Sequence, residues 1–149
     1  MTLKQWADNG WLRPHTTSAA EIQNLLAIVK RDLSDAAGDI SADWRFGIAY
    51  NAALKLCSIP LFASGYRPEK ALQHYRTIAA LPVILGDTLK DDALYLEACR
   101  IKRNTVEYDM AGAVTGQDAK ELAQFAKELR QTVLDWLRKH HPEFLEKGR

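Results

Sequence analysis

The segment 42–64 constrains the fold more than any other part of the chain, because it is apolar on almost every side. Ser41 is placed to cap a helix that begins at Ala42. A helix with apolar residues on most of its surface lies at the centre of a bundle. The polar positions within it and Pro60 argue against a membrane span, so a buried core helix is predicted. At 100° per residue its only continuous polar stripe consists of Gly47, Asn51, Lys55 and Ser58.

The remaining segments also have helical periodicity, and almost no alternating pattern typical of strands occurs. Further helices are predicted at 3–9, at 19–37, from Pro68 to about Pro82, at 91–109 and at 117–140. Residues 11–14 are predicted as a turn. Because the connections are short, neighbouring helices are expected to be antiparallel. The sequence therefore predicts an all-α fold, an up-and-down antiparallel bundle of about five helices.

Composition places the chain among ordinary globular proteins. Its 149 residues predict a single domain, 1–149, and its 20 basic against 19 acidic residues give a net charge of +1. This balance provides no general attraction to nucleic acid or to a membrane, so only a local basic patch could provide one. Cys57 and Cys99 lie within apolar helical patterns and are predicted as buried free thiols. The chain is expected to be cytoplasmic, without a metal or another cofactor, since no metal-ligand or dinucleotide motif occurs.

The helix predicted at 91–109 is the most informative part of the sequence. Its spacing predicts one buried edge of Leu94, Ala98, Ile101 and Thr105, and a second of Tyr95, Cys99 and Val106. A polar stripe lies between them and is made of Arg100, Arg103, Asn104, Glu107 and Tyr108. Charged stripes on helices are often only solvated surface. A stripe set between two buried edges instead favours a cleft or a subunit interface, where arginine can bind a phosphate through two hydrogen bonds.

The segment Arg103-Asn104-Thr105-Val106-Glu107-Tyr108 resembles the motif region of the HEPN superfamily. The motif of that family is an arginine, a polar residue that is often asparagine, a few more residues and then a histidine. Arg103, Asn104 and the spacing of four intervening residues match it. The resemblance implies a helical bundle that dimerises through the motif helices and forms one composite cleft. Many members are metal-independent endoribonucleases of toxin–antitoxin or defence systems, and others only bind nucleotide or RNA.

The sequence departs from the family at its histidine, because Tyr108 stands in that position. An imidazole titrates near neutral pH, whereas a phenol with a pKa near 10 is a poor general base. Arg103 remains able to hold a phosphate, so binding without efficient cleavage is expected. His74 on another helix is the alternative proton carrier. The candidate catalytic residues are thus Arg103, Tyr108 and His74.

Three functions follow from these residues. The first is a homodimeric module that binds RNA or a nucleotide through Arg100, Arg103, Asn104, Glu107 and Tyr108. The second is a metal-independent endoribonuclease of non-standard type. The third is a helical adaptor whose polar stripe is only a docking face. For the first two, the resemblance implies a toxin–antitoxin partner, a nucleotidyltransferase-like antitoxin.

Overall fold

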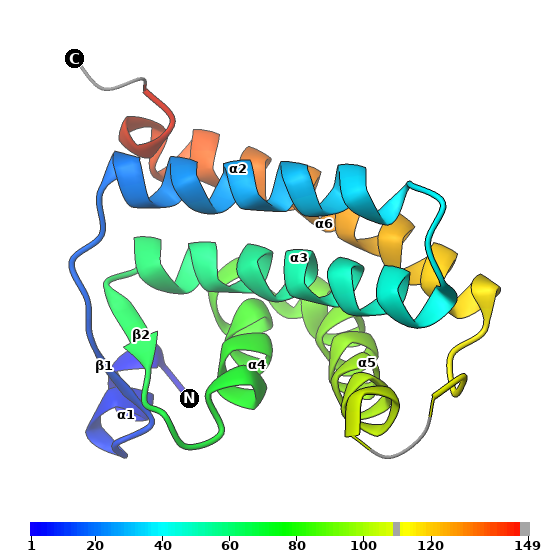
Figure 1. The fold of residues 1–149 in the computed structure, drawn as a ribbon. Helices are drawn as coiled ribbons and strands as arrows, with labels where there is room; N and C mark the ends of the chain where they lie inside the picture. The colour runs from blue at the N-terminus through cyan, green and yellow to red at the C-terminus, as the bar shows by residue number, and fades with distance from the viewer. Residues whose placement is uncertain (109–110, 147–149) are drawn as a thin grey trace.

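A computed structural model of the chain describes residues 1–108 and 111–146, and for 106–108 it describes only the backbone. The described chain folds as the predicted all-α bundle, with one small two-stranded ribbon (Figure 1). The helices are α1 (Leu3–Asp8), α2 (Ala19–Ala36), α3 (Ala42–Ala63), α4 (Gln73–Leu85), α5 (Lys90–Tyr108) and α6 (Gly116–His140). Two short 3₁₀ turns are η1 (Asp87–Leu89) and η2 (Pro142–Phe144), and the ribbon strands are β1 (Leu12–Pro14) and β2 (Tyr66–Pro68).

Helix α3 lies at the centre, as its apolar surface predicts. It contacts α2, α4, α5 and α6. Figure 1 shows α2 and α6 on one side of α3, with α4 and α5 on the other side and running across it. The Ser41 hydroxyl caps α3 by accepting a hydrogen bond from the Trp44 backbone N–H at 3.3 Å. The central position of α3 fixes which of its residues face α4 and α5, and therefore the surroundings of the candidate site.

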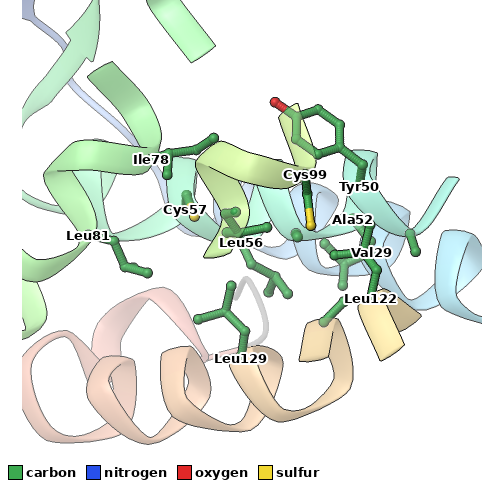
Figure 2. Close-up of a cluster of buried hydrophobic side chains, with 14 of the residues drawn as sticks. Val29, Tyr50, Ala52, Leu56, Cys57, Ile78, Leu81, Cys99, Leu122 and Leu129 are labelled. Atoms are coloured by element: carbon green, nitrogen blue, oxygen red, sulfur yellow. The ribbon is translucent and has the colours of Figure 1, made fainter. Parts of the chain in front are cut away.

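The core forms around the inner residues of α3, where it meets α2, α4, α5 and α6. Leu56 and Cys57 of α3 are fully buried, and Cys99 of α5 is also buried (Figure 2). The two thiols are free, as predicted. Helix α6 buries most of the apolar face that its periodicity predicts. Five residues of that face are buried and two are partly buried against the core: Leu122, Ala126, Leu129, Val133 and Leu137 in the first group, and Phe125 and Trp136 in the second. Such close packing of interlocking side chains supplies most of the stability of a helical bundle.

The ribbon corrects the prediction for two segments. Residues 12–14, predicted as a turn, pair in antiparallel register with residues 66–68, and Arg13 lies opposite Arg67. Pro68 therefore belongs to a strand and does not begin a helix, and α4 begins only at Gln73. Proline fits either position, because its fixed φ suits both a helix start and an edge strand. Only the pairing partner, more than fifty residues away along the chain, decides between them.

Helix α5 also differs from the prediction. Leu94 and Ile101 were expected on a buried edge, but they are 70% and 56% exposed, and Ala98 is exposed as well. Among the described side chains of α5, the buried ones are Ala93, Leu96 and Cys99, and only Cys99 was predicted on a buried edge. Helix α5 packs against α4 and α3, so one face is covered and the opposite face points outward. The arginines of α5 therefore lie on the side that faces the protein, and the apolar stripe with Leu94 and Ile101 lies on the side that faces solvent.

Helix α3 is long and apolar enough to cross a membrane by length and composition, and 61% of its most apolar stretch is buried inside the protein. Four other helices contact it. This burial is typical of the core helix of a soluble protein.

Candidate functional site

Arg103 of α5 lies over the buried ring of Tyr50 on α3. The Arg103 guanidinium carbon is 5.4 Å from the centre of the Tyr50 ring, within the range of a cation–π contact. Arg103 follows Leu94 by nine residues, about two and a half turns at 100° per residue, so the two side chains lie on opposite sides of α5. The outward position of Leu94 and the inward position of Arg103 are therefore two aspects of the same helix rotation.

Arg100 is held by Glu97, a residue that the sequence analysis did not single out. The Arg100 Nε donates to Glu97 Oε1 at 3.0 Å and to Oε2 at 3.1 Å, and its Nη2 lies 2.5 Å from Oε1. The two side chains are only 26% and 22% exposed. The hydrogen bond to Glu97 raises the pKa of Arg100 above its ordinary value. The guanidinium held by this pair lines a small hollow together with His74 at the start of α4.

His74, in the first turn of α4, completes this group. Its ring is half-buried and its centre lies 6.4 Å from the centre of the Tyr50 ring. Burial lowers the pKa of His74 below its ordinary value, and the positive charges of Arg103, Arg100 and Lys55 lower it further. The imidazole is therefore neutral at pH 7, which is the form that accepts a proton. The structure thus brings His74, predicted only as an alternative proton carrier, next to both arginines.

The sequence analysis did not single out Tyr50, which lies within the largely apolar core helix. Its side chain is fully buried, and among the described residues its hydroxyl has no hydrogen-bond partner. Figure 2 shows this hydroxyl pointing away from the aliphatic cluster. Burial raises the pKa of the phenol, so it stays protonated and can donate a hydrogen bond. The sequence signal that could have identified Tyr50 as a site residue was its position next to Asn51 of the polar stripe.

The other predicted site residues are only partly described. Asn104 is half-buried on α5. The side chains of Glu107 and Tyr108 lie outside the described residues, so the position that replaces the family histidine is placed only by its backbone at the end of α5. The site that the structure defines therefore consists of Arg100, Arg103 and His74 around Tyr50. We call this group the arginine site.

A hollow of about 400 Å³ adjoins the arginine site at the start of α3. Arg103 and Asn51 line it, together with Trp44, whose side chain is 71% exposed. Trp44 is one of the apolar residues of the predicted core helix, yet the structure leaves it exposed near the start of α3. An exposed indole beside a guanidinium offers a flat stacking surface next to a cation, the combination on which bases of single-stranded nucleic acid stack.

The surface between α5 and α6 has the opposite charge. A wide hollow there is lined by four carboxylates, with Lys120 as a basic neighbour. The acidic residues are Asp91, Asp92, Glu121 and Glu128. Burial and the negative charges of Asp91 and Glu128 raise the pKa of Asp92. An anionic ligand is therefore repelled from this face and attracted to the arginine site.

Comparison of the chain with protein-family models, with curated proteins and with solved structures gives no match in any of the three. The resemblance to the HEPN motif thus depends on Arg103, Asn104 and their spacing. The functional argument depends on the geometry of the arginine site and of the hollow beside it.

Proposed function

We propose that the protein is a HEPN-like helical domain that binds RNA or a nucleotide at the arginine site, with little or no cleavage. The observation that carries the proposal is the inward rotation of α5, which places Arg100 and Arg103 near His74, with Arg103 over the ring of Tyr50. Helix surfaces normally expose their arginines and bury their leucines. Helix α5 buries Leu96 but exposes Leu94 and Ile101 while Arg100 and Arg103 are half-buried, so we infer that the arginines have a role beyond solvation.

The hollow beside Arg103 supports a nucleotide ligand over a simple anion. A phosphate held by Arg103 lies next to Trp44, on which a base can stack, and Asn51 supplies a polar group that can hydrogen-bond to a base. Base stacking on an aromatic side chain contributes about 1–3 kcal/mol. A charge-assisted hydrogen bond to phosphate contributes about 1.5–3 kcal/mol. Together these contacts favour a single-stranded RNA or a nucleotide as the ligand.

Weak or absent catalysis follows from Tyr108, which replaces the residue that titrates near neutral pH in the family. One observation favours the endoribonuclease as a second candidate. His74 is neutral at pH 7 and lies close enough to both arginines for their charges to lower its pKa. It is thus the side chain of the arginine site that can take a proton from a ribose 2′-hydroxyl while the arginines hold the phosphate.

We propose a homodimer formed through the outward stripe of α5, made of Leu94, Ala98 and Ile101. Water-exposed apolar residues at helical spacing are typical of a surface that packs against another helix. The arginine site lies on the opposite side of α5, so each protomer keeps its own site in such a dimer. The composite cleft implied by the family resemblance requires a different interface. In that arrangement a variant that disrupts the dimer also loses RNA affinity, whereas here it does not.

The biological setting that fits this function is a toxin–antitoxin or defence system in the cytoplasm. A nucleotidyltransferase-like antitoxin is the partner that the resemblance implies. Co-purification from cells that express both proteins tests this pairing. If the chain instead acts as an adaptor, it binds a protein partner and Arg103 has no effect on RNA affinity.

The test is a comparison of RNA binding and cleavage among variants. Fluorescence anisotropy with a labelled single-stranded RNA, in the presence of chelator, measures affinity for wild type, Arg103→Ala and Arg103→Lys. We expect about a tenfold or greater loss for Arg103→Ala. Arg103→Lys keeps the charge but loses the planar fork, so its affinity is also expected to fall. Trp44→Ala is expected to weaken binding through lost stacking.

Arg138→Gln is the matched control, because Arg138 is an exposed residue of α6 that pairs with Asp135. It removes the same charge and is expected to leave affinity nearly unchanged. Cleavage by wild type is expected to be very weak, and Tyr108→His is expected to raise it. Unchanged affinity in both Arg103 variants contradicts the proposal. Strong wild-type cleavage that disappears in His74→Ala supports the endoribonuclease instead.

A further inference from the structure

A second basic surface lies at the ribbon, apart from the arginines of α5. A pocket of about 270 Å³ is enclosed by the two strands, the start of α4 and the side of α3. We call it the ribbon pocket. Its polar lining includes Arg13, Ser58, Arg67, Lys70, Gln73 and His74. Among the described residues that line it there is no carboxylate. Three basic side chains thus surround a small hollow without an acidic residue in its wall.

The ribbon brings two of these cations together at a cost. Arg13 and Arg67 are directly opposite in the antiparallel register, so their side chains project from the same face of the ribbon. Like charges in that position destabilise a strand pair. Lys70 adds a third positive charge two residues after β2 ends. An anion held among these side chains removes the repulsion.

The hydrogen bonding and the charge of Arg67 are only partly balanced by its neighbours. The Arg67 Nε is buried and has no hydrogen-bond partner among the described residues. Glu21 is near enough to Arg67 for the arginine to contribute to lowering its pKa. Its carboxylate, however, bonds to His15 Nε2 at 2.6 Å and to the Thr17 hydroxyl at 2.7 Å. Glu21 therefore offsets part of the positive charge and does not occupy the pocket.

The start of α4 adds a further attraction for an anion. Leu72, which precedes the helix, has a left-handed backbone with φ of 54° and forms no side-chain cap. The first backbone N–H groups of a helix have no partner within it, and the helix dipole places positive charge at this end. Gln73 and His74 of this first turn line the pocket. The backbone and the basic side chains thus act in the same direction.

We propose that the ribbon pocket is a phosphate-binding site that shares His74 with the arginine site and uses different basic side chains, Arg13, Arg67 and Lys70. Its ligand is a phosphate group, either free inorganic phosphate or a phosphate of a nucleic acid strand. His74 also borders a small hollow lined by Arg100, so the two sites adjoin. A strand that places one phosphate on the α5 arginines can place another in the ribbon pocket. The phosphate site itself needs no contribution from Arg103.

The experiment is a titration followed by two-dimensional amide NMR, with sodium phosphate as the probe and sodium chloride of equal ionic strength as the reference. We expect phosphate to shift the amide signals of 73–75 and of β2, and to raise the thermal midpoint of unfolding. Arg13→Gln and Arg67→Gln are expected to weaken this binding about tenfold or more. Arg138→Gln, with the same loss of charge on α6, is expected to bind phosphate as wild type does.

Because Arg13 is exposed, Arg13→Gln is expected to fold normally, and its circular dichroism spectrum checks this. Titration with an RNA oligonucleotide that carries a 5′-phosphate, and with the same strand carrying a 5′-hydroxyl, then shows whether the bound phosphate is free or belongs to a nucleic acid strand. Shifts only with free phosphate indicate a small-molecule site, and shifts with either strand indicate nucleic acid. Equal phosphate binding by wild type and both ribbon variants overturns the proposal. Phosphate binding retained in Arg103→Ala, with RNA affinity also unchanged in that variant, overturns the arginine site alone.

Discussion

Helices α5 and α6 have similar lengths and both contain apolar residues at helical spacing, yet only one of them follows its sequence pattern. Helix α6 buries its apolar face, with Leu122 fully buried. Helix α5 exposes Leu94 and Ile101 and turns Arg103 over Tyr50. The difference shows that periodicity identifies the buried face when a helix has one apolar stripe. When apolar stripes flank a charged stripe, the positions of the neighbouring helices determine which face is buried.

The largest expected effect contrasts leucines from the two helices. Leu122→Ala is expected to lower the free energy of unfolding by about 2–5 kcal/mol, because it leaves a cavity in the packed core. Leu94→Ala is expected to change it by less than about 0.5 kcal/mol, since the side chain is largely in water. Urea unfolding at low protein concentration measures both. Similar losses for the two variants contradict the outward rotation of α5.

The second prediction concerns the outer stripe of α5. Leu94→Asp is expected to raise the dimer dissociation constant by about tenfold or more, because the interface would bury an unpaired charge. Light scattering behind a sizing column measures the change. RNA affinity per protomer is expected to persist, because the stripe and Arg103 lie on opposite sides of the helix. Affinity that falls together with dimerisation indicates a composite cleft, and a monomeric wild type at tens of micromolar excludes the dimer.

The third prediction concerns Tyr50, where the inward face of α5 meets α3. Tyr50→Phe removes a buried hydroxyl that has no partner among the described residues. We expect the free energy of unfolding to rise by about 1 kcal/mol, since the cost of burying that group disappears. If the hydroxyl donates to a bound ligand, RNA affinity falls while stability rises. Lower stability in the variant shows that the hydroxyl has a partner in the folded protein.

The smallest expected effect concerns the charge of His74. Its pKa is lowered in the folded state, so the unfolded chain binds a proton more readily there. The His74 contribution therefore makes the free energy of unfolding fall as pH drops below about 6.5, until the folded state is also protonated. His74→Gln is expected to show a smaller decline between pH 7 and pH 5. NMR titration of the imidazole provides a direct check, and a midpoint above 6.5 contradicts the arrangement.

The sequence by itself determined the helical class, the central place of α3 and the buried face of α6. Each of these depends on local rules, namely helical periodicity and capping groups such as Thr115 and Asp118, which form a capping box at the start of α6. The sequence also selected Arg100, Arg103 and His74 as candidates, although it placed His74 on a different helix from the two arginines and did not specify that the three lie together.

Only the tertiary structure decided the rest. The ribbon depends on pairing between Arg13 and Arg67, residues far apart in the chain, and no local pattern specifies such a partner. The rotation of α5 depends on which sides α3 and α4 cover, because a charged stripe between apolar ones fits more than one orientation. The same packing buries Tyr50, exposes Trp44 and brings His74 to the arginines. Residue types indicated which chemistry was available, and the packing of α3, α4 and α5 decided where it assembles.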